Sequence, residues 1–287
     1  MTQLLNRTAA GLVLLGDEAV ARGAIDAGVT AAYSYPGTPA TEILESILTL
    51  DSPGVTAQWT ANEKTAYEAA LGVSMAGRRA LVAMKHVGLN VAADPFINSA
   101  LVAIAGGLVV VVADDPGMHS SQNEQDSRYM ADFARIPCLE PGSPQQAYEM
   151  TREAFDLSER FGIPVMLRLV TRIAHSRSRV TTTPGRPTNP MHKTAHPEDW
   201  TLLPANARRR WRHLLDLQKE MVGWTEVSHH NVLTLSEDDR GLGVITAGIG
   251  RNHYMESVAE LGFAPSHLHV GAYPLPAAAV HSLARRV

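Results

Sequence analysis

The 287-residue sequence contains a single cysteine, Cys138, and this scarcity excludes several kinds of site. One thiol cannot build an internal disulfide framework, and cysteine-ligated iron–sulfur clusters usually need four thiolates. The chain therefore cannot hold such a cluster by itself. Because Cys138 follows Pro137 directly, we expect it to be a packed or boundary residue.

Long apolar runs and a strong excess of one charge are also missing. The first ten residues contain no long apolar stretch, and the apolar run 11–15 is followed at once by Asp17 and Glu18. The sequence thus predicts neither a signal peptide nor a membrane span. A formal net charge of -4 argues against a nucleic-acid partner. With 45% hydrophobic and 19% charged residues, the composition is that of a globular enzyme, which we expect to be cytoplasmic.

The sequence does contain a regular alternation of strand-like and helix-like runs up to residue 176. Such an alternation predicts right-handed βαβ units, and hence an α/β fold with a mainly parallel sheet and helices on both faces. The run Leu108–Ala113 is apolar throughout, which is typical of a central strand covered on both sides. The predicted strands are 11–15, 30–35, 55–59, 79–85, 107–113 and 163–170, with a weaker one near 136–140. The predicted helices are 17–27, 39–50, 62–76, 90–105 and 144–161.

The regular pattern ends at Arg177. Prolines and a glycine within 181–190 predict a linker, 177–240, that contains only a short helix near 205–222. That helix carries a run of arginines, which usually indicates a solvated or inter-subunit face. Residues 241–287 begin a second βα pattern, for which we expect two strands of an incomplete domain. Its Gly-Ile-Gly turn lacks the third glycine of a dinucleotide fingerprint and is a weak phosphate-loop signal.

One carboxylate, Glu63, lies where a predicted strand gives way to a predicted helix. It follows the alternating apolar and polar run Val55–Trp59, and ligands of open α/β sheets collect at the carboxyl ends of the strands. An acid at such a place can be catalytic. Thr60 and Glu63 also have the spacing of a capping box, in which the glutamate bonds back to the start of the helix and does no chemistry.

Several short sequence motifs around Glu63 occur in a fixed order along the chain. They are YPGTP at 35–39, NEK at 62–64, MKHVGLN at 84–90, VAADP at 91–95 and DDPGMHSSQNEQD at 114–126. Together they make residues 16–176 resemble the pyrimidine-binding domain of thiamine-diphosphate-dependent 2-oxoacid:ferredoxin oxidoreductases. The resemblance is closest to the alpha subunits that act on indolepyruvate. It further suggests that residues 241–287 begin a transketolase C-terminal-like domain.

The resemblance implies that Glu63 is catalytic, because the family's glutamate at this position hydrogen-bonds N1′ of the cofactor's aminopyrimidine. A carboxylate there favours the imino tautomer, whose 4′-nitrogen then accepts the proton from the thiazolium C2. Positioned proton transfer of this kind contributes on the order of 10²–10⁴-fold to a rate. We also expect Gly37, Gly88 and Asn90 to lie beside the cofactor.

Four further residues are candidates for substrate contact: Thr38, Lys85, His86 and His119. Thr38 matches a family position whose hydroxyl lies near the substrate, although threonine is also a favoured helix N-cap. Lys85 and His86 end a predicted strand just ahead of Gly88, where a glycine permits close backbone approach, whereas a lysine at a strand end is usually solvated. The long polar loop 119–126 has the character of an active-site or subunit-interface loop. No residue of this chain is expected to bind a metal.

The sequence motifs of a diphosphate-binding domain are absent. Thiamine enzymes of this family hold Mg²⁺ and the diphosphate with a Gly-Asp-Gly motif and a later asparagine, and neither occurs here. We therefore expect a diphosphate-binding domain or beta subunit to supply the Mg²⁺ site, and iron–sulfur clusters to lie in another region or partner. The chain is then a fragment or one part of a split enzyme, and we expect a homodimer or hetero-oligomer.

The resemblance implies oxidative decarboxylation of a 2-oxoacid, an arylpyruvate such as indolepyruvate, to acyl-CoA with reduction of ferredoxin. Two alternatives stay open. A non-oxidative thiamine decarboxylase with split domains would share Glu63 but would need no iron–sulfur clusters. A non-catalytic subunit would keep the same fold with an unused pocket.

Overall fold

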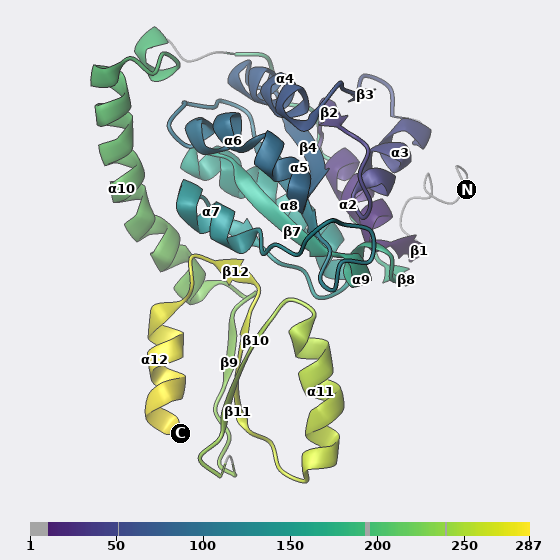
Figure 1. Ribbon diagram of the computed structural model, residues 1–287, viewed down its shortest axis with the longest axis vertical. Helices are drawn as coiled ribbons and strands as arrows, with labels where there is room; N and C mark the ends of the chain where they lie inside the picture. Colours follow the sequence, from purple (N-terminus) through teal and green to yellow (C-terminus); the bar gives the residue numbers. More distant parts are fainter. Residues whose placement is uncertain (1–10, 51, 193–195, 239) are drawn as a thin grey trace.

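The structure is a computed structural model that describes residues 11–50, 52–192, 196–238 and 240–287. Its main body is a seven-stranded sheet between two layers of helices (Figure 1). The strand order is β12-β6-β7-β5-β4-β2-β3, and all neighbours run parallel except β12, which is antiparallel to β6. The α/β class predicted from the sequence is confirmed. The strands are β2 (Ala31–Ser34), β3 (Thr56–Trp59), β4 (Ala80–Lys85), β5 (Leu108–Asp114), β6 (Cys138–Leu139), β7 (Val165–Val170) and β12 (Ala272–Tyr273).

Helices cover both faces of this sheet, as right-handed crossovers require. One layer contains α2 (Gly16–Asp26), α3 (Thr41–Thr49) and α8 (Pro144–Phe161). The other contains α4 (Glu63–Met75), α5 (His86–Val91), α6 (Ala93–Ser99) and α7 (Arg128–Ala134). The longest of these, α8, begins at the N-cap Ser143, which accepts a hydrogen bond from the Gln146 amide, and ends at Gly162 in the left-handed region.

The middle of the sheet is the driest part of the molecule. All seven residues of β5 are buried, as are all six of β7, so the prediction of a central strand at Leu108–Ala113 is confirmed. Aromatic side chains close the core from the helical layers: Tyr67 of α4 packs edge-to-face on Phe96 of α6 with 6.0 Å between ring centroids. No helix among the described residues is both long and apolar enough to cross a bilayer.

The first predicted strand does not join the main sheet. Instead β1 (Leu12–Leu15) pairs antiparallel with β8 (Arg177–Val180) in a separate two-stranded ribbon. Leu12 and Leu14 are buried whereas Val13 is 63% exposed, so only one face of this strand is covered. The predicted parallel strand at 11–15 is therefore wrong in its partner, because an apolar run alone does not specify which strand it pairs with.

The helix predicted at 90–105 is also wrong in extent. Two short helices, α5 and α6, occupy residues 86–99 and meet at Ala92, whose φ and ψ angles are -88° and 5°. Pro95 lies in the first turn of α6, where its missing N–H costs no helical hydrogen bond. Residues 103–107 are outside any helix and return the chain to β5.

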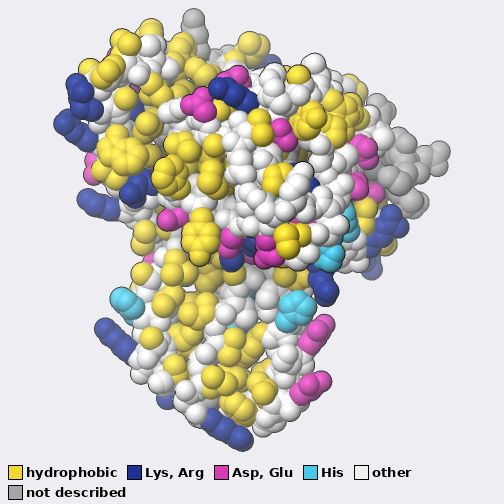
Figure 2. Space-filling model, viewed as in Figure 1, with side chains coloured by type: hydrophobic (Ala, Val, Ile, Leu, Met, Phe, Trp, Pro, Cys, Tyr) yellow, Lys and Arg dark blue, Asp and Glu magenta, His cyan; other side chains and the backbone are white. Residues whose placement is uncertain are grey.

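The segment predicted as a linker with a short helix contains α10 (Pro204–Val227), which is 24 residues long. Four apolar residues of α10 are buried against the main body: Leu214, Leu217, Met221 and Trp224. The ring of Trp224 packs edge-to-face on Phe161 at 6.2 Å. Figure 2 shows basic side chains along the outer side of this helix, in agreement with the predicted solvated face. Arg210 differs, since its Nε donates to the Leu101 carbonyl of the main body at 2.9 Å.

The C-terminal lobe is a small three-stranded sheet with one helix on either side (Figure 1). Its order is β10-β11-β9, with β10 parallel and β9 antiparallel to β11. The two strands expected in this region are present as β10 and β11, and a third strand, β9, joins them from the segment assigned to the linker. The elements of the lobe are β9 (Val232–Thr234), β10 (Gly243–Ala247), α11 (Gly250–Leu261), β11 (Ser266–Val270) and α12 (Ala277–Arg286). Two short elements lie outside both sheets: α9 (Thr171–Ala174), which follows β7, and the 3-10 turn η1 (Pro197–Asp199), which precedes α10.

One buried arginine connects the carboxyl ends of the central strands. Arg168 of β7 donates through Nε to Asp114 of β5 at 2.7 Å and through Nη1 to Glu140, which follows β6. The Tyr273 hydroxyl on β12 donates to Glu140 at 3.1 Å, so the strand between β11 and α12 of the C-terminal lobe joins the same network. Arg168, Asp114 and Glu140 are all buried; Arg168 is the cation that pairs with Asp114, whereas Glu140 also pairs with Arg128 at 3.3 Å.

Arg168→Met should lower the free energy of unfolding by roughly 3–5 kcal/mol, because it leaves the buried Asp114 carboxylate without a cation and Glu140 with Arg128 alone. Tyr273→Phe is the matched control, since it removes two hydrogen bonds from the same network, to Glu140 and from Arg128, at an expected cost of about 0.5–1.5 kcal/mol each. Denaturant titration of the full chain measures both. Equal losses for the two variants would show that the arginine charge is not what holds the network.

Candidate active site

The carboxyl ends of four parallel strands bring most of the predicted site residues to one edge of the sheet. Gly37 and Thr38 follow β2, Glu63 follows β3, and Lys85 and His86 end β4 and begin α5. The loop that contains His119 follows β5. This edge is where open α/β sheets bind ligands.

Glu63 is the first residue of α4, and it does not form a capping box. The N-cap is Asn62, whose side chain accepts a hydrogen bond from the Thr65 amide at 2.9 Å. The Thr60 hydroxyl instead donates to the carbonyls of Ser34 at 3.2 Å and Asn62 at 2.8 Å. Among the described residues none donates a hydrogen bond to the Glu63 carboxylate, which is half-buried. The capping interpretation is wrong, and the acid is available for another partner.

Gly88 provides the space in which the Glu63 side chain lies. A Cβ atom at position 88 would be 2.5 Å from Glu63 Oε1 and 2.8 Å from Glu63 Cγ. Only glycine permits this approach, because separations under 3.0 Å are sterically prohibited for a real side chain. Glu63 and Gly88, which lie 25 residues apart in two different sequence motifs, are thus in van der Waals contact. Asn90, two residues further along α5, is exposed.

A second group of contacts forms around Lys85. Its aliphatic stem passes over Gly37, where a Cβ would be 3.1 Å from Lys85 Cδ. Its Nζ donates to the Ser120 carbonyl at 3.1 Å, and the Ser120 hydroxyl donates to the Thr38 carbonyl at 3.2 Å. Lys85 is therefore not a freely solvated strand-end residue. It joins the β2 turn to the loop after β5.

Thr38 is exposed and does not cap a helix. Helix α3 begins at Thr41 with Ala40 at its N-cap, and the Thr41 hydroxyl accepts a hydrogen bond from the Gly37 amide at 3.0 Å. The N-cap interpretation of Thr38 is wrong for this reason. The turn formed by residues 35–40 leaves the Thr38 hydroxyl without a structural hydrogen bond among the described residues.

The loop 115–127 is held by carboxylates at both of its ends. Asp115 accepts hydrogen bonds from the Ser120 amide at 2.7 Å, the Ser121 hydroxyl at 2.8 Å and the Thr171 hydroxyl at 2.8 Å. Burial raises the pKa of Asp115, but these hydrogen bonds outweigh it and hold the pKa well below its usual value. Asp114 accepts from the Ser127 amide at 3.0 Å and so fixes the other end.

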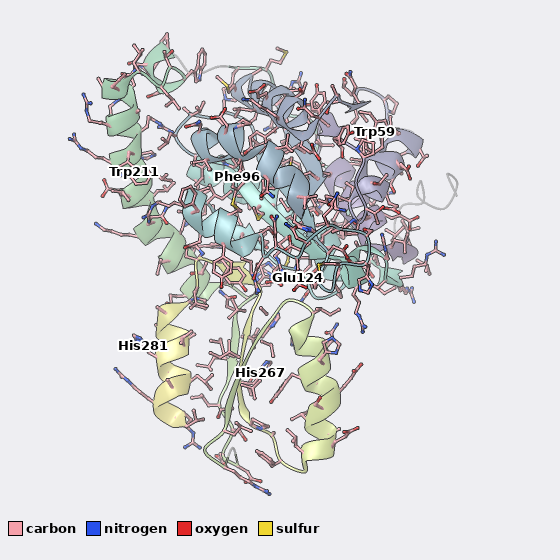
Figure 3. The ribbon with its side chains drawn as sticks, viewed as in Figure 1. Trp59, Phe96, Glu124, Trp211, His267 and His281 are labelled. Atoms are coloured by element: carbon pink, nitrogen blue, oxygen red, sulfur yellow. The ribbon has the colours of Figure 1, made fainter. Side chains whose placement is uncertain are left out.

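His86 anchors the middle of this loop. Its Nε2 lies 3.0 Å from the Asn123 carbonyl, which can only accept, so Nε2 donates this hydrogen bond. Nδ1 is buried and has no hydrogen-bond partner among the described residues. Glu124, labelled in Figure 3, accepts from the Gly117 amide at 2.8 Å and tightens the turn of the loop. The loop is built as one unit with the strand ends.

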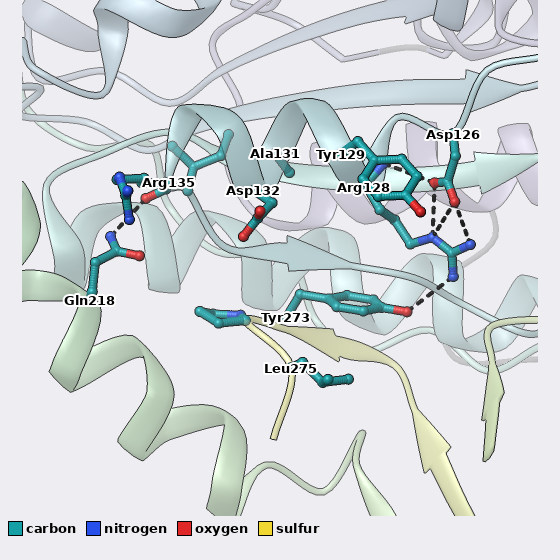
Figure 4. A pocket seen from close by; sticks show the side chains of 11 residues that line it. Asp126, Arg128, Tyr129, Ala131, Asp132, Arg135, Gln218, Tyr273 and Leu275 are labelled. Atoms are coloured by element: carbon teal, nitrogen blue, oxygen red, sulfur yellow. Dashed lines mark hydrogen bonds and ion pairs between the residues drawn. The ribbon is translucent and has the colours of Figure 1, made fainter. Parts of the chain in front are cut away.

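His119 points to a neighbouring cavity and is not brought to Glu63. That cavity, of about 460 Å³, lies between the loop and the C-terminal lobe and is lined by Thr171, Arg172, His175 and His253 among others. A further cavity of about 390 Å³, drawn in Figure 4, lies between α7, α10 and the chain around Tyr273. It contains none of the predicted cofactor or substrate residues.

Three residues that shape the site lie in the ordered motifs but were not among the predicted site residues. Asp115 and Ser120 fix the loop, and Asp94 forms an ion pair of 3.0 Å with Lys64, the neighbour of Glu63. The contacts of Ser120 with Lys85 and of Asp94 with Lys64 join residues 35 and 30 positions apart, whereas Asp115 binds Ser120 within one loop. The sequence motif that contains Asp114 and Asp115 does not show which neighbour each carboxylate will bind.

The chain matches known proteins over most of its length. Residues 22–229 match the family model described as pyruvate flavodoxin/ferredoxin oxidoreductase, thiamine diP-bdg. The indolepyruvate oxidoreductase subunit IorA of Archaeoglobus fulgidus is 40% identical over 271 residues, covering 92% of this chain and 43% of the relative. IorA of Pyrococcus abyssi is 41% identical over 258 residues, covering 88% and 40%. The chain therefore spans less than half the length of these curated relatives.

Two other matches are more distant. The 2-oxoglutarate synthase subunit KorA of Methanothermobacter thermautotrophicus is 30% identical over 174 residues, covering 58% of this chain and 46% of the relative. A solved 2-oxoglutarate:ferredoxin oxidoreductase of Magnetococcus marinus, with 2-oxoglutarate, coenzyme A and succinyl-CoA bound, superimposes with a TM-score of 0.79 at 18% identity. It covers 96% of this chain and 56% of that one, and it supports the fold. Since the family model takes in well over half of its residues, the chain belongs to the thiamine-diphosphate-binding family of pyruvate flavodoxin/ferredoxin oxidoreductases.

Proposed function

We propose that this chain provides the pyrimidine-binding half of the thiamine diphosphate site in a 2-oxoacid:ferredoxin oxidoreductase. The observation that supports this most directly is the Glu63 carboxylate, which stands at the strand-end edge without a structural partner. The close approach of Gly88 fixes where its oxygen atoms lie. Since the chain spans less than half of its relatives, the activity belongs to the complete assembly.

Thiamine diphosphate, when bound, supplies a nucleophilic carbon that adds to the carbonyl of a 2-oxoacid. The task of Glu63 is to exchange a proton with a pyrimidine nitrogen, for which a carboxylate on a rigid helix start is suited. A glutamine at this position would keep the hydrogen-bonding shape but could not exchange the proton. Gly37 and Asn90 are proposed to lie along the cofactor, and Thr38, Lys85 and His86 along the substrate.

The diphosphate, its Mg²⁺ and the iron–sulfur clusters are proposed to lie in other domains or subunits. The described residues of the site offer no Gly-Asp-Gly turn, and burial raises the pKa of the lone Cys138 thiol, so it does not supply a thiolate ligand. A diphosphate-binding domain or beta subunit must then cover the edge that contains Glu63. This need agrees with an assembly larger than one chain, either a homodimer or a hetero-oligomer. The cytoplasmic location inferred from the sequence stays a prediction.

An arylpyruvate such as indolepyruvate is the substrate that the relatives favour. The IorA proteins are about 40% identical over nearly the whole chain, whereas the KorA subunit of 2-oxoglutarate synthase is 30% identical over little more than half. In the proposed reaction CO₂ leaves, the acyl group passes to CoA, and two electrons pass to ferredoxin. A non-oxidative decarboxylase is the second candidate, because it would use the same Glu63.

Glu63→Gln in the complete assembly should lower turnover by about 10²-fold or more, the scale for a lost proton-transfer group. The fold should be kept, since Asn62 rather than Glu63 caps α4. Glu68→Gln, an exposed change of the same kind on the same helix, is the matched control and should leave turnover unchanged. Ferredoxin reduction with indolepyruvate and CoA is the assay. Normal turnover of the Glu63 variant would sink the proposed role.

Gly88→Ala should have nearly the same effect without touching the acid itself. Its methyl group would lie 2.5 Å from Glu63 Oε1, so the carboxylate must move and thiamine diphosphate should bind more weakly. Gly72→Ala is the control, because a Cβ at position 72 of α4 meets nothing within 4 Å. That change should stabilise the helix by up to about 1 kcal/mol and leave cofactor affinity alone. Equal affinities for the two variants would contradict the proposed contact.

The isolated chain should bind thiamine diphosphate weakly or not at all, because the charged contacts to the diphosphate are proposed to lie elsewhere. Calorimetry on the 287-residue chain with Mg²⁺ present tests this. A dissociation constant near 1 μM, about 8 kcal/mol of binding free energy, would mean that this chain holds a complete cofactor site.

A further inference from the structure

A cluster of metal-ligating side chains lies outside the candidate active site, where the main body meets the C-terminal lobe. It consists of Glu153, His229 and His230, whose donor atoms all lie within 4.8 Å of one another. Glu153 lies on α8, in the helical layer opposite α4. The two histidines lie in the turn between α10 and β9, so the cluster joins segments 77 residues apart in the sequence.

The three side chains differ in exposure in a way that suits ion binding. His230 Nε2 lies 2.7 Å from Glu153 Oε2, with side-chain exposures of 3% and 27%. The His229 ring is exposed and lies beside the His230 ring, with 3.9 Å between centroids and 44° between planes. Burial raises the pKa of Glu153, but the hydrogen bond with His230 and the nearby imidazoles outweigh it and hold the pKa below its usual value. An exposed imidazole leaves a path for an ion.

The backbone around the two histidines is fixed before any ion arrives. The His230 carbonyl accepts from the Gly271 amide at 3.1 Å, and the Asn231 side chain accepts from the Gly271 and Ala272 amides at 2.9 and 3.0 Å. A Cβ at position 271 would lie 3.0 Å from the His230 carbonyl oxygen, so glycine is what permits this close approach. A site held in this way loses little conformational entropy when it binds an ion.

We propose that Glu153, His229 and His230 bind a divalent transition-metal ion, of which Zn²⁺ is the best match. Two imidazole nitrogens and one carboxylate oxygen are a common protein ligand set for zinc, with the fourth position open to water. With zinc-to-donor distances of about 2.0–2.2 Å, tetrahedral donors lie about 3.3 Å apart. In the structure the His230 and Glu153 donors are 2.7 Å apart and all three donors lie within 4.8 Å of one another, so a bound ion requires the first contact to widen and the side chains to adjust to this spacing.

A simple ion pair between His230 and Glu153 accounts for only part of the arrangement. It explains the 2.7 Å contact, but the exposed His229 ring, whose centroid lies 3.9 Å from that of His230, takes no part in that pair. Mg²⁺ and Ca²⁺ prefer oxygen ligands and are poorly matched to two imidazoles. A metal bound here connects α8 to the start of β9 and so fixes the C-terminal lobe on the main body.

The test uses the full chain, first stripped of metal with a chelator, and Zn²⁺ as the titrant in calorimetry. The wild type should bind one Zn²⁺ per chain, and Zn²⁺ should raise its melting temperature. His229→Ala, at an exposed side chain, should retain the fold and weaken this binding by at least about 10-fold, the lower end of what even an outer-sphere partner contributes. Co²⁺ in place of Zn²⁺ should give the visible absorption of a four-coordinate site, and His229→Ala should abolish it.

Two control variants make the result specific. His281→Ala removes an exposed histidine of α12, labelled in Figure 3, and should bind Zn²⁺ like the wild type. His175→Ala removes the only histidine of a second acidic cluster, formed with Asp17 and Glu42, and should also bind normally. Loss of Zn²⁺ binding in the His175 variant but not in the His229 variant would overturn the proposal, as would a wild type that binds no Zn²⁺.

Discussion

The structure depends on one buried cation, Arg168, at the carboxyl end of β7. It compensates Asp114 at the end of β5 and Glu140 beyond β6, and it lies 3.6 Å from Asp126. Through Asp114 it also fixes the amide of Ser127, where the loop after β5 ends. Without this charge the ends of β5 and β6 would bring the buried carboxylates of Asp114 and Glu140 together with only Arg128 beside them, which is strongly unfavourable. Arg168 thus helps to position the loop over the candidate site, although it is not itself proposed to contact the cofactor or the substrate.

The candidate site is built on the same principle of indirect support. Asp115 holds Ser120, and Ser120 in turn joins Lys85 to the Thr38 carbonyl, so three crossovers of the sheet are joined by single hydrogen bonds. Glu63 differs from Lys85 and Ser120, since no structural partner among the described residues uses its carboxylate. A half-buried acid without a structural partner is the feature that distinguishes this edge from an ordinary sheet edge.

The sequence predicted those parts of the structure that depend on local patterns. The central strand Leu108–Ala113 is recognisable because complete burial requires an unbroken apolar run. The sequence motifs around Glu63 identify the family because they are long and occur in a specific order. Partner choice was not predictable in the same way. β1 has the pattern of a strand but pairs with β8, and the Thr60-to-Glu63 spacing matches a capping box although Asn62 caps the helix. In each case a contact between distant residues decided between two locally acceptable structures.

The C-terminal lobe shows why a boundary drawn from composition fails here. The prolines within 181–190 suggest a linker at 177–240, yet this range contains β9, and α10 within it packs four apolar residues on the main body. After β11 the chain returns as β12 to the outer edge of the main sheet, where Tyr273 meets Glu140. The seven-stranded sheet is therefore complete only when the lobe is present, because β6 would otherwise expose an unpaired edge. The lobe and the main body are thus joined through β12, which belongs to the main sheet. Glu153 and His230 also join the two parts and help to hold the lobe against the body that carries the candidate site.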